Sequence, residues 1–216
     1  MMLIKDRWTR AAPHFNLSLF VFAAFFLYPG SAFIEIDAGT PLPGFTDFVE
    51  QVQNGEANVL RGVYVPGVLA LPVSQQPADD PNYVSDRDGE ATQFSAAAQL
   101  GNIGLLAHNN RSGKSFSQLE PGQEIRLVYG DGKVEYFLVT EILRFQALEP
   151  KSAWSEFRNI MSDEVFSAAQ VFERAYSGER HVTFQTCIRA YGNWNWGRLF
   201  VMAVPVGSHG FRLRPR

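Results

Sequence analysis

The chain has 216 residues, of which 46% are apolar and 13% aromatic, and it carries a net charge of −3. This length suits one domain with a sizeable core, and the aromatic content excludes an intrinsically disordered chain. The single cysteine excludes a disulfide scaffold and a cysteine-rich zinc site. The negative charge excludes a basic nucleic-acid footprint. With four histidines and one cysteine, few side chains remain as candidates for chemistry.

The N-terminal segment has the pattern of an export signal. Three basic residues within the first ten precede an apolar run over 17–28, and small residues follow at 30–32. A helix of this length spans about 18 Å, which is less than the roughly 30 Å hydrocarbon core of a bilayer. We therefore expect 1–32 to be a signal peptide cleaved after Ala32, with an uncleaved membrane anchor as the alternative. Either reading predicts a protein that acts outside the cytoplasmic membrane.

Residues 33–57 are expected to form an N-terminal extension with a short helix over 46–53. The acidic stretch 74–91 lacks the spacing of a calcium-binding loop, so we expect a solvated loop there. A second short helix is expected over 93–100.

Most of the chain between residues 58 and 205 has the pattern of β-strands. Runs of β-branched and apolar residues are separated by Gly and Pro, and Gly130-Asp131-Gly132 is a strong hairpin signal. The expected strands are 62–66, 67–73, 103–108, 124–129, 133–143, 181–187 and 198–204.

The period changes between residues 151 and 176. Apolar side chains there recur every three or four residues, which predicts one or two amphipathic helices. The residues of this pattern are Trp154, Phe157, Met161, Val165, Ala168, Phe172 and Tyr176. About seven or eight strands with one helical insertion predict a mainly β protein built as a closed, mixed β-barrel. Residues 206–216 are expected to be a basic C-terminal tail.

Cys187 is the first candidate for chemistry. In the run from His181 to Cys187, a two-residue period places Thr183, Gln185 and Cys187 on one face of the strand. The thiol then shares its face with polar residues at a strand end. A lone cysteine is most often a buried structural residue. A free thiol in an exported protein is exposed to oxidation, however, so such a residue is often present for its reactivity.

A thiol nucleophile needs a proton partner and a cation or donor for the oxyanion. His108 ends an apolar strand and enters a polar turn, whereas His181 lies in the strand of Cys187, about 20 Å away if that strand is extended. The cation candidates are Arg189 and Arg198. Arg198 begins the strand that we expect to return beside Cys187 across a hairpin of ten residues.

These residues resemble the signatures of the sortases, cysteine transpeptidases of prokaryotic cell envelopes. The family has a strand ending in His, a strand end of the form T-L-x-T-C, and an Arg opening the next strand. Here they stand as Gly104-Leu-Leu-Ala-His108, Thr183-Phe-Gln-Thr-Cys187 and Gly197-Arg198-Leu-Phe-Val. The resemblance covers residues 58–205. It departs at Phe184, where leucine is usual, at the Asn-Asn that follows His108, and in the long insertion at 151–176.

The resemblance implies a sortase-type barrel and a cysteine transpeptidase. We expect no cofactor, and the sequence shows no set of metal ligands. Cys187 would attack a C-terminal sorting signal on an exported protein, and His108 would protonate the leaving amine. Arg198 would hold either the oxyanion or the backbone of the signal. A peptidoglycan or pilin amine would then resolve the thioester. The substrate-binding candidates are Thr186, Trp194 and Trp196, the tryptophans being placed in a loop where they could wall the groove or pack at a hairpin tip.

Two alternatives stay open. One is a sortase-like barrel without activity that serves as a surface binding or assembly module. The other is an L,D-transpeptidase, suggested by Cys187-Ile-Arg189. That family has His-Gly two residues before the cysteine, and Gln185-Thr186 stand here instead.

Overall fold

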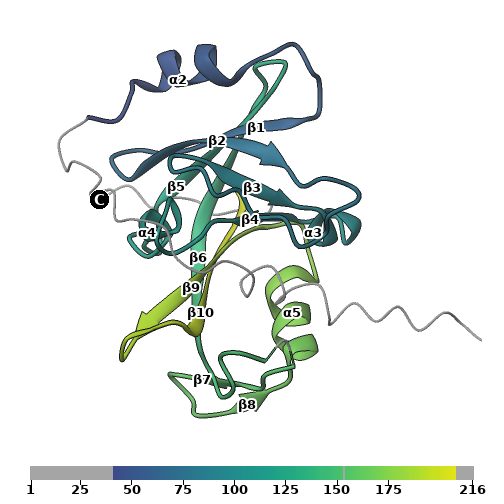
Figure 1. The fold of residues 1–216 in the computed structure, drawn as a ribbon. Helices are drawn as coiled ribbons and strands as arrows, with labels where there is room; N and C mark the ends of the chain where they lie inside the picture. Colours follow the sequence, from purple (N-terminus) through teal and green to yellow (C-terminus); the bar gives the residue numbers. More distant parts are fainter. Residues whose placement is uncertain (1–40, 153, 208–216) are drawn as a thin grey trace, which may run out of the picture.

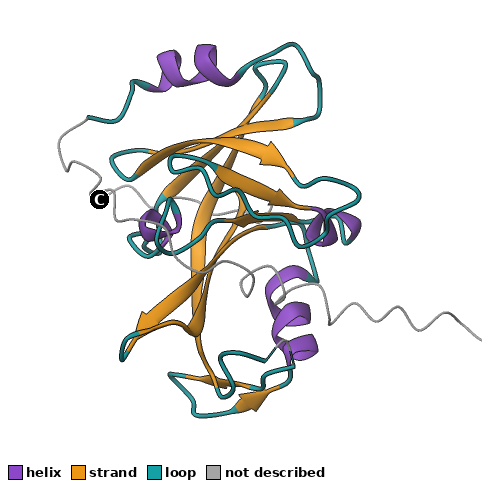
Figure 2. Ribbon diagram, viewed as in Figure 1, coloured by secondary structure: helices purple, strands orange, loops and turns teal. Residues whose placement is uncertain are grey.

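The computed structural model describes residues 41–152 and 154–207. Figure 1 and Figure 2 show a barrel of strands with helices on its outside. The sheet order is β10-β9-β4-β3-β2-β1-β5-β6-β7-β8, and a further pairing of β10 with β6 closes the first eight strands into a barrel. The expectation of a mainly β, closed barrel is confirmed.

The barrel is mixed, as expected. Strands β2 and β3 run parallel, and so do β4 and β9, while the other neighbours run antiparallel. The barrel strands are β1 Leu60–Val65, β2 Leu69–Gln75, β3 Ala91–Phe94, β4 Ile103–Leu106, β5 Glu124–Tyr129, β6 Val134–Ala147, β9 Val182–Ala190 and β10 Asn193–Pro205. Strand β3 begins at the last residue of the stretch expected to be loop and also takes up the first two residues of the expected helix at 93–100. The expected hairpin at Gly130-Asp131-Gly132 joins β5 to β6, and Gly132 there has a φ of 82°.

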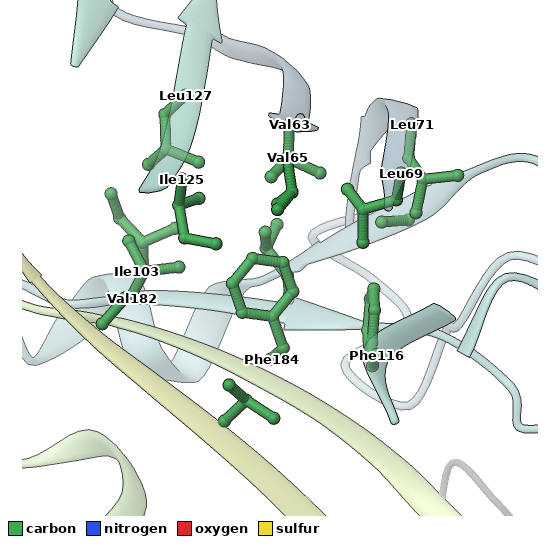
Figure 3. Packing of buried hydrophobic residues seen from close by; sticks show 14 of the residues in the cluster. Val63, Val65, Leu69, Leu71, Ile103, Phe116, Ile125, Leu127, Val182 and Phe184 are labelled. Atoms are coloured by element: carbon green, nitrogen blue, oxygen red, sulfur yellow. The ribbon is translucent and has the colours of Figure 1, made fainter. Parts of the chain in front are cut away.

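The interior of the barrel is filled by alternate apolar side chains from the strands. Figure 3 shows residues of this cluster, drawn from the barrel strands and from α4. Phe184, which stands where the sortases usually have leucine, points into it and meets the Phe116 ring edge-on at 5.1 Å. The larger side chain is therefore accommodated by an aromatic pair in the core.

Helices cover parts of the outer surface. Helix α2 (Phe45–Val52) packs Phe48 and Val52 against Tyr64 and Val128, and it lies within one residue of the expected range. Helix α3 (Ser95–Gln99) follows β3 and confirms the second expected helix. Helix α4 (Gly113–Phe116) follows the turn after β4.

Helix α5 (Ala168–Tyr176) covers the outer face next to β9. Ser167 and Gln170 form a reciprocal capping box, which fixes the start of this helix. Its buried residues pack against Phe94 on β3 and Phe200 on β10.

The expectation of helix over 151–176 is wrong for its first half. Residues 157–166 form two short strands, β7 (Phe157–Asn159) and β8 (Val165–Phe166), which extend the sheet beyond β6. Phe157 is buried by this pairing, whereas Met161 in the turn between β7 and β8 is 86% exposed. The apolar residues of this stretch therefore do not share one helical face, and their spacing came from strand positions and a turn.

No helix in the described part of the chain is long and apolar enough to span a bilayer. The expected signal segment, 1–32, and most of the basic tail lie outside the described residues.

Candidate active site

Cys187 lies on β9, between β10 and β4 in the barrel. It faces outward with Gln185, whose side-chain oxygen accepts a hydrogen bond of 2.5 Å from the Tyr176 hydroxyl of α5. The thiol is 5% exposed and forms no disulfide. Strand β9 continues for three residues beyond Cys187, to Ala190, so the thiol lies within the strand rather than at its end.

Arg198 is the direct cross-strand partner of Cys187. Their Cα atoms are paired in the antiparallel register of β10 and β9, so the two side chains leave the sheet on the same face. The guanidinium is buried, and its Nη1 donates to the carbonyls of Gly197, at 2.9 Å, and Asn195, at 3.3 Å. Its central carbon lies 5.9 Å from the centre of the Phe157 ring on β7. These contacts hold a cation beside the thiol.

His108 follows β4, which runs parallel to β9. Leu106 pairs with Gln185, and the amide of Ala107 still donates to the Gln185 carbonyl at 3.3 Å. Continuing this register by two residues along each chain sets His108 beside Cys187. The structure thus brings the three expected strands together in the order β10-β9-β4. His108, Cys187 and Arg198 therefore stand on neighbouring segments of the sheet, near the end of β4.

The surroundings of His108 act on its protonation in opposite directions. Burial lowers the pKa of the imidazole, and it outweighs the nearby Asp86 carboxylate and a hydrogen bond that the ring donates to the Val84 backbone, which raise it. The Nε2 atom of His108 lies 3.6 Å from Oδ1 of Asp86. The net effect favours the neutral ring.

Burial likewise dominates at the thiol. It raises the pKa of Cys187, and the charge of Arg198 counters this only in part. Neutral thiol and neutral imidazole are therefore the main resting forms. The thiolate that a nucleophilic reaction needs is a minor form at neutral pH.

Thr186 faces the other side of β9 from Cys187. Its hydroxyl is buried and donates to the Ala107 carbonyl at 2.8 Å. The side chain expected to bind substrate thus ties β9 to the segment that carries His108. Gly113, at the start of α4, lies against the same place, because a Cβ there would be 2.7 Å from the carbonyl oxygens of Ala107 and His108.

Trp194 and Trp196 lie on β10 and not in the expected loop. The hairpin has two residues, Tyr191 and Gly192, both with positive φ as in a type I′ turn, and not ten. Strand β10 contains a bulge between Asn193, which pairs with Ala190, and Gly197, which pairs with Ile188. The extra residues of β10 lie in this bulge. The run Asn-Trp-Asn-Trp alternates polar and aromatic residues, so the sequence carried a strand signal that the loop expectation overlooked.

The two tryptophans belong to a surface next to the site. The Arg189 guanidinium lies 4.0 Å over the Trp194 ring, and the Trp196 ring meets that of Tyr191 at 6.0 Å. Asn109, directly after His108, donates to the Trp194 carbonyl at 2.8 Å. The turn that bears His108 is therefore fastened to β10. Arg189 is exposed, as expected.

Sequence reasoning missed Asp86, Asn109 and Gly113. Asp86 lies in the stretch assigned to solvated loop, and nothing in a run of acidic residues shows which of them will meet a histidine. Gly113 did carry a signal, because glycine is the residue used where backbone segments approach closely.

The described residues contain no group of three or more His, Cys, Asp or Glu side chains that could hold a metal ion. Two surface hollows of about 420 and 320 Å³ are lined by other residues. The first is formed mainly by Gln75, Gln76 and Gln93, and the second by Glu135, Arg180 and their neighbours.

Comparison with known proteins gives a match in structure alone. No protein-family model and no curated protein matches the sequence. Among solved structures, the chain is similar to sortase A from Listeria monocytogenes, with 16% identity and a TM-score of 0.44 over 68% of this chain and 86% of that one. It is also similar to a sortase D5 transpeptidase from Clostridium perfringens, with 16% identity and a TM-score of 0.45 over 75% and 86% of the two chains.

A third similar structure is sortase C-1 from Actinomyces oris, with 12% identity and a TM-score of 0.46 over 77% of this chain and 82% of that one. At these identities the similarity concerns the fold alone.

Proposed function

We propose that the protein is a sortase-type cysteine transpeptidase of the cell envelope. The observation that carries the proposal is the cross-strand pairing of Cys187 with Arg198, with the His108 segment on the other side of the cysteine strand. A thiol, an imidazole and a fixed guanidinium are the three groups that a thioester mechanism needs.

In the proposed first step, the Cys187 sulfur attacks the carbonyl carbon at the cleavage site of a C-terminal sorting signal. Arg198 stabilises the oxyanion that develops on the carbonyl oxygen. The C–N bond breaks, and the leaving amine takes its proton from His108. The product of this step is a thioester on Cys187.

In the second step, a peptidoglycan or pilin amine attacks the thioester carbonyl, gives a proton to His108, and releases the Cys187 thiolate. The substrates would be exported proteins, and the protein itself would act on the outer side of the cytoplasmic membrane. N-terminal sequencing of the protein from membrane and secreted fractions tests this placement. Cleavage near Ala32 or retention of Met1 in membranes agrees with it, whereas intact protein in the cytosol contradicts it.

Formation of the thioester is the direct test of the chemistry. The protein is incubated with a library of sorting-signal pentapeptides and an amine, and intact mass is followed for an acyl adduct. We expect an adduct on the native protein and none on Cys187→Ala. A native protein that forms no adduct with any member of the library contradicts the proposal.

The burial of Cys187 favours a second candidate, a sortase-like binding module without activity. This protein would bind a sorting-signal peptide without forming an adduct, and equally well after Cys187→Ala. An L,D-transpeptidase is less well supported, because Arg189, the arginine of that pattern, is exposed and packs on Trp194.

A further inference from the structure

The loop between β2 and β3 brings a carboxylate to His108. Oδ1 of Asp86 lies 3.6 Å from Nε2 of the imidazole. The Asp86 side chain is 58% exposed and that of His108 is 22% exposed, so the pair lies at the boundary between protein and solvent. A carboxylate at this distance attracts the imidazolium more than the neutral ring.

The first half of this loop is fixed by one buried amide. Gln76, 9% exposed, donates from Nε2 to the carbonyls of Pro81 and Tyr83, each at 2.9 Å. Its oxygen accepts hydrogen bonds from the amide and the hydroxyl of Ser95, at 3.0 and 2.6 Å. One side chain thus fastens the loop to the start of α3.

The second half is fixed on both sides of Asp86. The buried amide of Ser85 donates to the Thr92 hydroxyl of β3 at 2.9 Å. The amide of Glu90 donates to the hydroxyl of Ser112 at 3.0 Å, and Ser112 belongs to the turn that begins at His108. The segment carrying Asp86 and the segment carrying His108 are therefore joined to each other as well as to the barrel.

We propose that Asp86 is a positioning residue that holds the His108 imidazole by pairing with its Nε2 atom and balances the charge that the ring carries as a proton donor. The kinetic part of this inference rests on the proposed function, whereas the pairing itself does not. Asp86 touches no reacting atom, so its effect passes through His108.

Other charged and titratable groups near His108 come from its own turn, from β9 and β10, and from the loop that carries Asp86. Arg111, in the same turn, opposes protonation of the ring. Cys187 on β9 and Arg198 on β10 lie on the neighbouring strands. Within the loop, Glu90 is engaged by Arg87, whose Nη1 lies 3.8 Å away. Asp86 is therefore the carboxylate that most directly favours a charged ring.

The first test uses the intact protein without substrate. Titration of the imidazole CH signals by NMR, with the His108 signal assigned through His108→Gln, gives the pKa of His108. Asp86→Asn should lower it by about 0.3–0.7 pH units, the size expected for a half-exposed pair. Asp88→Asn removes the same charge from the same loop and should leave the pKa unchanged, while Asp86→Glu should restore most of the shift.

The second test follows acyl-enzyme formation against pH. The reactive form is the minor thiolate–imidazolium pair, and its share falls as the pKa of His108 falls. Asp86→Asn should therefore lower the plateau rate about two- to fivefold. It should also move the acidic limb of the profile to lower pH by the same amount as the pKa of His108. A merely structural role would lower the rate without moving the limb.

The inference is overturned if the pKa of His108 is the same in the native protein and in a folded Asp86→Asn variant. It is also overturned if Asp88→Asn shifts the pKa as much, since the effect would then belong to the charge of the whole loop. A native protein that forms no acyl-enzyme contradicts the proposed function but leaves the NMR titration decisive for the pairing.

Discussion

Arg198 and Arg189 are both close to Cys187 in the chain, but their surroundings differ. Arg198 is 1% exposed and its guanidinium donates to two backbone carbonyls, whereas Arg189 is exposed and covers Trp194. A fixed, desolvated cation stabilises a developing oxyanion more strongly than a mobile, solvated one. The two arginines therefore form a matched pair of variants.

We predict that Arg198→Ala lowers the rate of acyl-enzyme formation about 100- to 1,000-fold, as loss of an oxyanion donor does, while Arg189→Ala stays within about tenfold. Arg198→Lys should restore little, because an ammonium does not reproduce the planar fork. The measurement is acyl-enzyme appearance by intact mass, with circular dichroism to check that each variant folds. If Arg189→Ala instead lost acyl-enzyme formation and Arg198→Ala kept it, the roles of the two arginines would be exchanged. That result would favour the L,D-transpeptidase alternative.

The pKa directions at Cys187 and His108 predict a broad pH profile. Burial raises the pKa of the thiol and lowers that of the imidazole, so the two values move apart. The ion pair carries the same number of protons as the neutral pair. The rate should therefore rise through the low pKa of His108, stay flat, and fall only above the ordinary pKa range of cysteine. A narrow maximum near pH 7 would contradict these directions.

At the scale of elements, the turn from β4 to α4 is a tightly packed part of the site. The amide of Gly113 donates to the His108 carbonyl at 3.0 Å, and Thr186 closes the same space from β9. A methyl group at position 113 would press on the carbonyls of Ala107 and His108, which are backbone and cannot rotate away.

We predict that Gly113→Ala destabilises the fold by about 1–3 kcal/mol, the usual cost of overpacking, and lowers acyl-enzyme formation further because the His108 turn shifts. Lys114→Ala, at the exposed next position of α4, is the control and should change neither quantity. Urea unfolding and the acylation rate are measured on both variants. If Gly113→Ala kept native stability and the native acylation rate, the prediction would be wrong, because the turn would then accept the methyl group without moving His108.

Elements whose pattern repeats locally could be predicted from the sequence. The alternation in β9 and the Gly130-Asp131-Gly132 turn each depend on neighbouring residues, and the structure has both. The stretch from 157 to 166 was mistaken for helix because two short strands and their turn happen to space apolar residues by three or four. Pairing with β6 decides its structure, and that is a long-range contact.

The residues of the candidate site also differ in how far the sequence could predict them. His108, Cys187 and Arg198 could be named as candidates because each stands at a recognisable place in a strand pattern. Asp86 was not, because its contact with His108 depends on the path of a loop held by Gln76 and Ser85. Such side-chain-to-backbone hydrogen bonds leave no periodic trace in the sequence.

At the scale of the whole molecule, one carboxylate links distant parts of the barrel. Glu135 of β6 accepts hydrogen bonds from Tyr129 of β5, Lys133 of the hairpin and Arg180, which precedes β9. Burial by itself raises the pKa of Glu135, but these hydrogen bonds outweigh it and lower the pKa to about 2. Arg180 is in turn held over the Phe137 ring at 5.3 Å.

A carboxylate whose folded pKa lies below its unfolded value of about 4.3 adds stability above that value and loses it as the pH falls through the folded pKa. We therefore predict that the native protein loses stability between about pH 4.5 and pH 2, and that Glu135→Gln loses less over this range. Thermal unfolding against pH measures it, with the exposed Glu173→Gln as control. Parallel curves for the native protein and Glu135→Gln would contradict the assignment.

The order of the strands along the chain also governs when the thiol is exposed. Cys187 is buried only after β9 has docked between β4 and β10 and β10 has paired with β6, and these two strands follow all the other barrel strands in sequence. Until then every partly folded form presents a free thiol to its surroundings. With one cysteine in the chain, disulfide formation at that stage can only link two molecules or attach a small thiol. In an oxidising compartment, the yield of active protein would then depend on whether the strands dock before the thiol meets a second chain. The yield would fall as the concentration of unfolded chains rises.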